Sequence, residues 1–281
     1  MFLVYNSDIL SESDFHVPYA DRAFQYGDGL FETIRYEQQQ VWFWADHFDR
    51  LSAGMTALHL ILPENFTAEA IHQRILALLT ANHLTRQPTR IKIQVWRQAG
   101  GLYTPTQHTT NVLITARPGQ GFAVTEKAKT TIFDSYRLAP SPVSVFKTLN
   151  ALPYVLAGIH KQQTAVDEVI LLDTTGNVAE CLSSNLFWFA DQTLYTPSLQ
   201  TGCINGILRR QLLRLASGSG ISVIQGHYPP KDILRAEAVF CANVMGIQWL
   251  RSIDNVSIPA TASPESNVVK LLNALFAQLH S

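Results

Sequence analysis

The stretch that divides this chain is Asn111-Val112-Leu113-Ile114-Thr115-Ala116-Arg117-Pro118-Gly119-Gln120-Gly121. Its first six residues form a strand-like run. One proline and two glycines within the next five residues then interrupt regular structure, as they do between folding units. We therefore predict a small first domain over residues 1–117, a linker over 118–123 and a larger second domain over 124–281.

Both sides of this seam mix helical and strand-like patterns. Before it, Ala68–Leu84 repeats apolar residues at helical spacing with Thr67 as a possible N-cap, whereas Arg90–Arg97 alternates like a half-buried strand. After it, the helical stretch Ile207–Ala216 lies among four strand-like runs, at Glu168–Asp173, Asn185–Ala190, Ile221–Gln225 and Ala238–Ala242. The pattern predicts two α/β or α+β domains, and active sites commonly lie between such domains.

The composition excludes several classes of partner. The 281 residues are 47% hydrophobic, which is enough for a sizeable core. Charged residues make up only 15%, against roughly 25% in an average soluble domain, which favours a surface hidden in a subunit interface. The net charge is -1 and no block of like charge occurs. We therefore expect neither a nucleic-acid partner nor an anionic membrane.

Membrane, export and metal-binding signals are also missing from the sequence. No run approaches the roughly 18 apolar residues of a membrane-spanning helix, and the first ten residues do not resemble a signal peptide. The three cysteines are far apart, and the nine histidines show no ligand spacing. We predict a cytoplasmic protein with no metal site and no disulfide framework.

Lys147 is the most unusual of the seven lysines, because it lies in the apolar segment Ser144–Asn150. A desolvated lysine has a lowered pKa, and a neutral amine can attack a carbonyl to form a Schiff base. The local sequence alone favours a lysine whose ammonium reaches water from a strand end. Lys92 also has isoleucine neighbours, yet strand alternation is expected to point it outward.

Three further segments could serve a cofactor. Glu180 opens an otherwise uncharged segment, where a carboxylate needs a partner such as a protonated pyridine nitrogen. Glycines at 202 and 206 precede a helix whose first amides could bind phosphate. Arg50 could bind a phosphate or carboxylate with its guanidinium. Each also has an ordinary interpretation: a turn acid, a tight turn and a surface ion pair.

Taken in order, five motifs resemble the fold-type IV (class IV aminotransferase) family of pyridoxal-phosphate enzymes. They are D-R-x-x-x-x-G-D-G-x-F-E-T-x-R at 21–35, H-F-x-R-L at 47–51, K-x-x-N at 147–150, E-x-x-x-x-N-x-F at 180–187 and N-G-I-x-R at 205–209. Each motif is modest, but their joint order and spacing are specific. The resemblance implies the two-domain, D-amino-acid aminotransferase-like fold, pyridoxal 5'-phosphate as cofactor and a homodimer with the cofactor between a small and a large domain.

The resemblance also implies roles for single residues. Lys147 matches the lysine that holds the cofactor as a Schiff base and moves the substrate Cα proton, and Glu180 matches the partner of the pyridine nitrogen. The implied phosphate contacts are Arg50, the backbone amides of Ile207 and Leu208, and Asn243, where many members have Thr or Ser. Arg97 and Tyr103 are candidates for holding a substrate carboxylate. Their alternatives are a strand-end surface arginine and a core tyrosine.

The second half of the chain is most similar to the family's 4-amino-4-deoxychorismate lyases, in segments 180–181, 185–188, 194–197 and 205–207. We therefore expect release of 4-aminobenzoate and pyruvate, a step of folate biosynthesis. An aminotransferase for branched-chain or related amino acids is the alternative. D-amino-acid aminotransferases carry R-x-H where this chain has Leu102-Tyr103-Thr104, which counts against that activity, and the joint motifs count against an inactive scaffold. Some lyases have Thr where this chain has Glu32.

Overall fold

The computed structural model describes residues 1–259 and 266–280 and contains two compact units. The first unit comprises Met1–Gly121 together with Phe146–Asn150, and the second comprises Phe122–Val145 and the chain from Ala151 onward. The chain first passes between the units after Gly121, inside the predicted linker. The contiguous division that we predicted differs at residues 146–150, which lie with the first unit.

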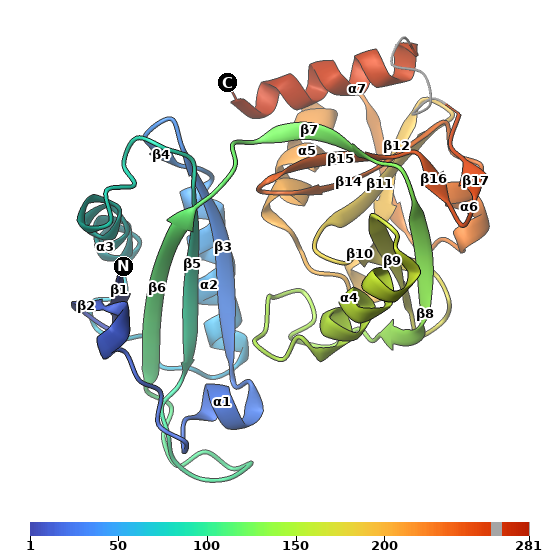
Figure 1. Ribbon diagram of the computed structural model, residues 1–281. Helices are drawn as coiled ribbons and strands as arrows, with labels where there is room; N and C mark the ends of the chain where they lie inside the picture. The colour runs from blue at the N-terminus through green and yellow to red at the C-terminus, as the bar shows by residue number, and fades with distance from the viewer. Residues whose placement is uncertain (260–265, 281) are drawn as a thin grey trace. The chain divides into compact units, whose positions relative to one another are not determined.

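The strands of the first unit form one antiparallel sheet in the order β2-β1-β6-β5-β3-β4 within the described residues (Figure 1). Both strands predicted before the seam are confirmed; β5 is one residue longer than predicted and β6 is three residues longer. The bounds are β1 (Phe2–Tyr5), β2 (Asp8–Ser11), β3 (Gly29–Glu37), β4 (Gln40–Val41), β5 (Thr89–Arg97) and β6 (Thr110–Pro118). A short helix, α1 (Arg22–Tyr26), precedes β3, and the 3₁₀ turn η1 (Glu12–Asp14) follows β2.

Two helices, α2 (Trp44–Ala57) and α3 (Ala68–Ala81), cover one face of this sheet (Figure 1). The predicted helical stripe of α3 is confirmed, because Ile71, Ile75, Leu78 and Leu79 are all buried in a core that also contains residues of β3 and β5. The Thr67 hydroxyl accepts a hydrogen bond from the Ala70 amide at 3.1 Å, as an N-cap does. The helix ends at Ala81, three residues before the predicted end.

The other face of the sheet is more polar. Thr33 on β3 and Lys92 and Gln94 on β5 are half-buried there. Trp96 lies on this face too, as strand alternation requires, but its ring is buried and its Nε1 donates to Asp21 Oδ2 at 2.7 Å. The indole packs with Leu3 and Leu113, so this end of the second face has an apolar cluster of its own.

Residues 147–149 add a short backbone pairing to the open edge of β3. The Phe31 amide donates to the Lys147 carbonyl at 2.8 Å, and the Leu149 amide donates to the Gly29 carbonyl at 2.9 Å. Between them, Leu30 and Thr148 form an antiparallel bridge. Because opposed residues share a face and neighbours alternate, this pairing places Lys147 on the same face as Phe31.

The second unit contains two sheets in the described residues, one in the order β10-β9-β8-β16-β17 and one in the order β13-β12-β11-β14-β15-β7. The four strands predicted after the seam are confirmed, with shifts of one residue at two of them. The bounds are β7 (Ala123–Lys127), β8 (Thr130–Leu138), β9 (Glu168–Asp173), β10 (Val178–Cys181), β11 (Asn185–Ala190), β12 (Thr193–Pro197), β13 (Ser222–Gly226), β14 (Ala238–Asn243), β15 (Gly246–Leu250), β16 (Ser252–Ile253) and β17 (Val256–Ser257).

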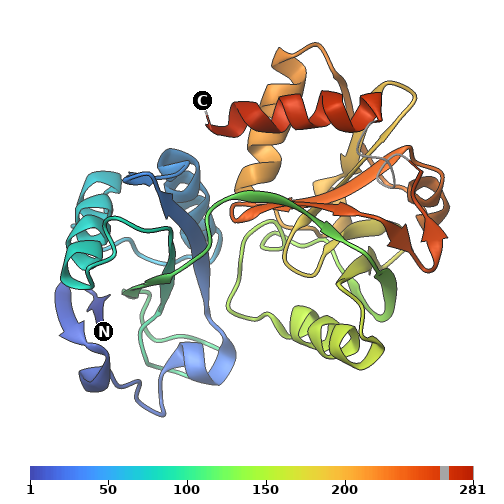
Figure 2. The ribbon, with the colours of Figure 1, turned by 45° about the horizontal axis from the view of Figure 1, so that its top comes forward.

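The helices of the second unit are α4 (Leu152–Thr164), α5 (Ile207–Gly218), α6 (Pro230–Leu234) and α7 (Asn267–Ala277), with 3₁₀ turns η2 (Leu199–Thr201) and η4 (Gln278–His280). The predicted helix that starts at Ile207 is confirmed as α5. Helices α5 and α7 lie side by side in both ribbon views (Figures 1 and 2). Side chains of β9, β10, β11 and β14 form a shared core between the two sheets.

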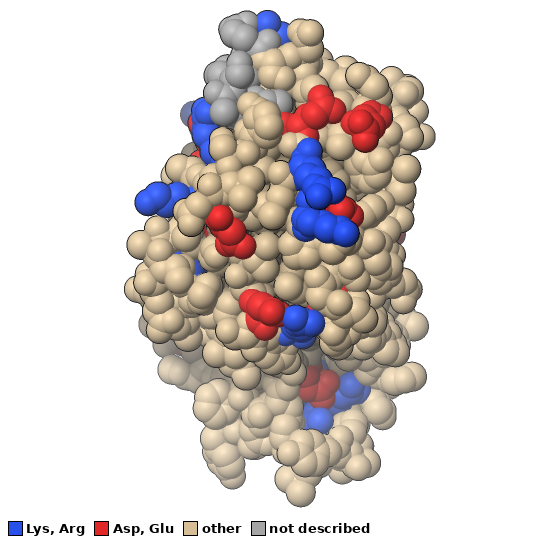
Figure 3. Space-filling view, turned by 90° about the vertical axis from the view of Figure 1, so that its right-hand side faces the viewer, with Lys and Arg blue, Asp and Glu red and all other residues tan. Residues whose placement is uncertain are grey.

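The face in Figure 3 shows acidic and basic side chains interspersed over largely uncharged surface. Cys181, Cys203 and Cys241 are buried and free of disulfide bonds. In the part of the chain that the structure describes, none of the helices has both the length and the apolar character needed to cross a membrane. The same residues contain no group of three or more His, Cys, Asp or Glu side chains that could hold a metal ion.

Gly29→Ala should loosen the docking of residues 147–149. A Cβ at this position would lie 2.3 Å from the Val95 carbonyl oxygen and 2.9 Å from Leu149 Cδ1. We expect a loss of about 1–3 kcal/mol in the free energy of unfolding, measured by urea titration. Gly218→Ala at the end of α5 is the control, because nothing lies within 4 Å of its added Cβ. Equal stability of the two variants would contradict this account.

Candidate active site

Lys147 lies beside the ring of Phe31. Its Nζ is 5.0 Å from the ring centroid, a cation–π distance, and its side chain is half-buried. The backbone pairing with β3 fixes the start of this side chain, while the aromatic ring borders its end. The structure therefore presents Lys147 from an ordered backbone segment of the first unit.

Glu32, His47 and Arg50 form a buried cluster on the helix-covered side of the first sheet. Arg50 Nε donates to Glu32 Oε1 at 2.7 Å and Arg50 Nη2 donates to Oε2 at 2.5 Å, which is a bidentate pair. His47, one helical turn before Arg50 on α2, donates from Nδ1 to Glu32 Oε2 at 2.6 Å. All three residues are at most 4% exposed, so Arg50 is not the surface ion pair of the alternative interpretation.

The contacts within this cluster determine the protonation of Glu32 and His47. Burial opposes ionisation of Glu32, but the charge of Arg50 and the hydrogen bond from His47 outweigh it and lower the Glu32 pKa to about 2. Burial lowers the pKa of His47, although Glu32 opposes this shift. His47 is thus neutral at neutral pH, and its Nε2 has no hydrogen-bond partner among residues 1–259 and 266–280.

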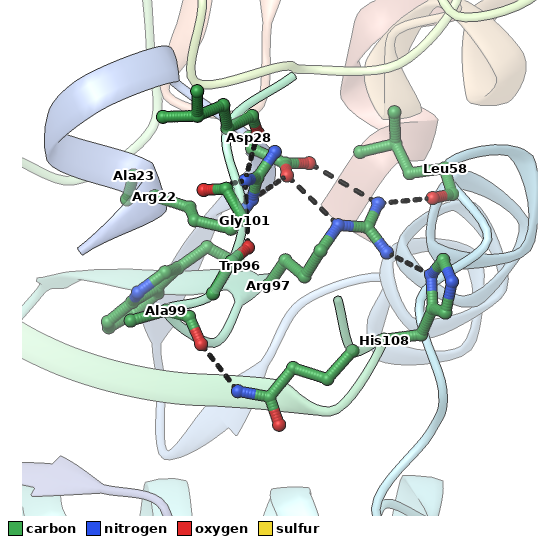
Figure 4. Close-up of polar contacts among 12 residues, drawn as sticks. Arg22, Ala23, Asp28, Leu58, Trp96, Arg97, Ala99, Gly101 and His108 are labelled. Carbon is green, nitrogen blue, oxygen red and sulfur yellow. Dashed lines mark hydrogen bonds and ion pairs between the residues drawn. The ribbon is translucent and has the colours of Figure 1, made fainter. Parts of the chain in front are cut away.

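Arg97 is held at the end of β5 by acceptors of its own chain (Figure 4). Its Nε donates to Asp28 Oδ2 at 2.9 Å, and its Nη2 donates to the Leu58 carbonyl at 2.7 Å. Its Nη1 donates to the His59 carbonyl at 3.2 Å and to His108 Nδ1 at 2.6 Å. Every guanidinium nitrogen therefore has an acceptor. These contacts rule out the interpretation of Arg97 as a strand-end surface arginine. They favour a structural role for Arg97 over direct binding of a substrate carboxylate.

Arg22 connects the same carboxylate to the loop after β5 (Figure 4). Its Nε donates to Asp28 Oδ2 at 2.7 Å, and its Nη1 donates to the carbonyls of residues 100–102 at 2.6–3.3 Å. Burial opposes ionisation of Asp28, but hydrogen bonds from both arginines lower its pKa. Tyr103 in this loop is 90% exposed and its ring lies 5.6 Å from that of Tyr26, so it is not a core tyrosine.

Glu180, in the second unit, is a buried carboxylate on β10. Its Oε1 accepts a 2.6 Å hydrogen bond from the Tyr154 hydroxyl of α4. Its Oε2 accepts from the Ile204 amide at 3.2 Å and from Asn185 Nδ2 at 3.4 Å. These contacts overturn the turn-acid interpretation, because a carboxylate that is 2% exposed has been fixed by donors from three separate segments.

Tyr154 is a site residue that the sequence reasoning missed. Burial, followed by the charge of Glu180, raises the pKa of its hydroxyl, so the proton stays on Tyr154 and is donated to the carboxylate. Burial and Glu180 similarly raise the pKa of Cys203 to about 12. The signal in the sequence was the position of Tyr154 in the first helix after Lys147, a helix that we had not predicted.

In the described part of the chain, no side chain caps the first amides of helix α5. Its N-cap residue is Gly206, so Ile207 and Leu208 occupy the first turn. A Cβ at Gly206 would lie 2.0 Å from Asn185 Oδ1, and Asn185 Nδ2 donates to the Ile204 carbonyl at 2.7 Å. The glycine thus lets the loop close on Asn185 and leaves the helix start open, a geometry suited to a phosphate.

Asn243 lies at the end of β14 and braces the turn after β10. Its Nδ2 donates to the Ser183 carbonyl at 3.1 Å and to Ser184 Oγ at 3.0 Å. Its Oδ1 accepts from the Met245 amide at 2.8 Å. The side-chain amide is therefore engaged with its own chain.

Comparisons with known proteins agree on one family. The model of the amino-transferase class IV family matches residues 29–253. The aminodeoxychorismate lyase of Vibrio harveyi is 29% identical over 238 residues, covering 83% of this chain and 85% of that protein. A Methanocaldococcus jannaschii protein named as a branched-chain-amino-acid aminotransferase is 30% identical over 243 residues, covering 85% of this chain and 83% of that one.

The solved structures confirm the predicted fold. The branched-chain aminotransferase of the archaeon Thermoproteus uzoniensis superposes with a TM-score of 0.88 at 20% identity, covering 99% of this chain and 94% of that chain. The expected fold-type IV architecture, with its mixture of sheets and helices, is therefore present.

Glu32→Gln should destabilise the protein by about 3–5 kcal/mol at neutral pH, because it leaves the buried Arg50 without its carboxylate. The Glu32 pKa is lowered from 4.5 to about 2, so its contribution is fully present above about pH 4.5 and is lost as the pH falls toward 2. Unfolding measured between about pH 6 and pH 3 should show a shallower decline in the variant than in wild type.

The control for this variant is Glu12→Gln, which breaks an exposed pair with Arg117. It should change the free energy of unfolding by about 1 kcal/mol or less. A Glu32→Gln protein with wild-type stability and wild-type pH dependence would show that the cluster is not charged as described.

Proposed function

The chain belongs to the amino-transferase class IV family, and from this premise we propose that it is a pyridoxal-phosphate-dependent 4-amino-4-deoxychorismate lyase. Enzymes of the family are lyases and aminotransferases that use this cofactor. When bound, pyridoxal phosphate supplies an electron sink for the negative charge that develops at the substrate Cα.

The residues of this chain fit such a group. The observation that carries the cofactor assignment is Glu180, a buried carboxylate held by Tyr154, Asn185 and the Ile204 amide. A carboxylate fixed in this way can keep a pyridine nitrogen protonated without itself moving. We assign that role to Glu180, with Tyr154 and Asn185 as its positioning residues.

Lys147 is assigned the covalent attachment of the cofactor and the proton transfer at Cα. Support comes from its K-x-x-N motif and from the backbone pairing that presents its amine beside Phe31. In both candidate reactions, the lysine amine accepts the Cα proton. The reactions differ after this step: pyruvate departs and the substrate ring becomes aromatic in the lyase, whereas an aminotransferase yields a keto acid.

The phosphate is assigned to the amides of Ile207 and Leu208 and to Arg50, with Asn243 as a further contact. The uncapped start of α5 supports the amides. Arg50 is neutralised by Glu32, so in this proposal it contributes oriented donors more than net positive charge. In this proposal Asn243 contacts the phosphate while its side-chain amide also donates to residues 183 and 184.

The lyase assignment rests on the second-half segments that are similar to lyases, at 180–181, 185–188, 194–197 and 205–207. The Vibrio harveyi relative adds support. The alternative, an aminotransferase for branched-chain or related amino acids, is favoured by the archaeal relative of similar identity. The loop that carries Tyr103 lacks the R-x-H residues of D-amino-acid aminotransferases, which makes that activity the weaker candidate.

We also propose a homodimer. Only 15% of the residues are charged, and α4 exposes apolar side chains at positions 152, 155, 156 and 159, which share one helical face. A second copy covering this face would remove apolar surface from water. The folate-pathway role and the cytoplasmic location stay predictions from the sequence.

The decisive assay incubates the cofactor-loaded protein with 4-amino-4-deoxychorismate and quantifies 4-aminobenzoate and pyruvate. We expect equal amounts of both products from wild type, none from Lys147→Ala and wild-type yields from the control Lys129→Ala, whose side chain is exposed in the second unit. A parallel assay supplies L-Leu, L-Ile, L-Val or a D-amino acid with 2-oxoglutarate. Keto-acid formation without 4-aminobenzoate would replace the lyase by an aminotransferase.

Glu180→Gln should reduce turnover by about a hundredfold or more, because an amide cannot hold the pyridine nitrogen in its protonated form. The matched control is Glu168→Gln, which changes another buried glutamate of the second unit. Steady-state kinetics of the two folded, cofactor-loaded variants check the difference. Equal rates would remove Glu180 from the assignment.

A further inference from the structure

Arg209, the last residue of the N-G-I-x-R motif, has no part in the function proposed above. It is the third residue of α5, and it is 2% exposed. Among the described residues of the second unit, no other lysine or arginine side chain is buried. Because an arginine keeps its positive charge at ordinary pH, the second unit holds one full cationic charge in its interior.

The guanidinium of Arg209 donates to neutral acceptors. Its Nη2 donates to the Pro197 carbonyl at 3.0 Å and to Gln225 Oε1 at 2.7 Å. Its Nε has no hydrogen-bond partner among residues 1–259 and 266–280, and no carboxylate of those residues lies within ion-pair distance of it. Burial lowers the pKa of Arg209, and the charge of Glu180 opposes this shift. A buried cation without an adjacent acid is unfavourable, and an anion nearby would stabilise it.

The place of Arg209 within α5 adds to the positive potential. The free amides at the start of a helix carry partial positive charge, which favours acidic residues there and opposes basic ones. The first turn of α5 contains no acidic residue, and its N-cap is Gly206. The amides of Ile207 and Leu208 and the guanidinium of Arg209 therefore all favour an anion at this helix start.

The phosphate of the assigned cofactor is such an anion, with a charge of about -1.5 to -2 at neutral pH. The contacts assigned to it so far supply little net charge. Arg50 is neutralised by its bidentate pair with Glu32, and the amides and Asn243 are neutral groups. Arg209 is the cation of the second unit whose charge is not already balanced by an ion pair.

We infer that Arg209 balances the charge of the cofactor phosphate from within α5, and so makes the enzyme hold the phosphorylated cofactor more tightly than its unphosphorylated form. This inference rests on the proposed cofactor. Arg209 is a positioning residue here: its guanidinium is engaged with Pro197 and Gln225, and its charge acts through space on the helix start.

A purely structural role makes a different prediction. The bond from Arg209 to Pro197 closes the loop over residues 198–208, which joins β12 to α5 and contains the Ile204 amide that donates to Glu180. If Arg209 served only to close this loop, its charge would not matter. A test must therefore change the charge balance and keep the contact.

Gln225→Glu makes that change. Gln225 is exposed, and a glutamate at this position would bring a carboxylate to the place of the oxygen that now accepts from Arg209. Full-length protein freed of cofactor is titrated with pyridoxal phosphate and with pyridoxal, and uptake is followed by visible absorbance. We expect Gln225→Glu to weaken binding of pyridoxal phosphate by about tenfold and to leave binding of pyridoxal unchanged. Urea titration should show no loss in its free energy of unfolding.

The matched control is Gln192→Glu, which adds a carboxylate at another exposed glutamine of the second unit and should bind both aldehydes as wild type does. Arg209→Met should reproduce the selective loss of affinity for pyridoxal phosphate, whereas Arg209→Lys should keep most of that affinity. Arg235→Met, at an exposed arginine, should have no effect.

Unchanged affinity of Gln225→Glu for pyridoxal phosphate would overturn the inference. So would an equal loss of affinity for both aldehydes, because it would assign Arg209 to the fold alone. Failure of the proposed function has a different signature: wild-type protein would then take up neither aldehyde, and no variant would differ from it.

Discussion

The backbone pairing of residues 147–149 with residues 29–31 is the constraint on which the position of Lys147 depends. It joins a segment from the middle of the chain to a sheet built from the first 118 residues. Because strand pairing fixes which face each side chain occupies, two hydrogen bonds and one bridge decide that Lys147 lies beside Phe31. Gly29 permits this approach by lacking a Cβ. The glycines of the D-R-x-x-x-x-G-D-G motif thus serve a lysine more than a hundred residues away.

The two buried glutamates Glu32 and Glu180 have different hydrogen-bond partners. Glu32 is paired with a full positive charge on Arg50, which lowers its pKa to about 2 and makes it a structural anion. Glu180 instead accepts hydrogen bonds from neutral donors, the Tyr154 hydroxyl and two amides. Such donors fix the orientation of a carboxylate. This orientation supports the proposal that Glu180 is the partner of the pyridine nitrogen.

The sequence predicted well what depends on short-range pattern. The stripe of α3, the alternation of β5 and the glycine at the start of α5 each follow from local rules, and the structure contains all three. Contacts between residues far apart in the sequence were harder to predict. Nothing near Arg97 indicates that Asp28, Leu58 and His59 would occupy its guanidinium, because those acceptors come from other segments of the chain.

The family resemblance also had limits as a guide to the environment of each side chain. The motif around Lys147 made this lysine the candidate for cofactor attachment, yet neither the motif nor local spacing indicated that residues 146–150 would fold with the first unit. Trp96 shows the same limit, since strand alternation gives the face on which it lies but not the apolar cluster that buries its ring there. Lys92 obeys the alternation rule, but its contact with the Phe31 ring follows only from the strand register.

The attachment of the loop at residues 100–102 has a consequence for how this scaffold can diversify. Arg22 holds that loop through carbonyl oxygens, and Asp28 holds Arg22. Main-chain oxygens are present whatever the side chains are, so the anchorage is indifferent to the residues displayed. Leu102 and Tyr103, 75% and 90% exposed, can therefore be exchanged through mutation without releasing the loop. Hydrogen bonds to the main chain thus keep the loop in place while its exposed side chains vary, which allows one scaffold to acquire new chemical preferences.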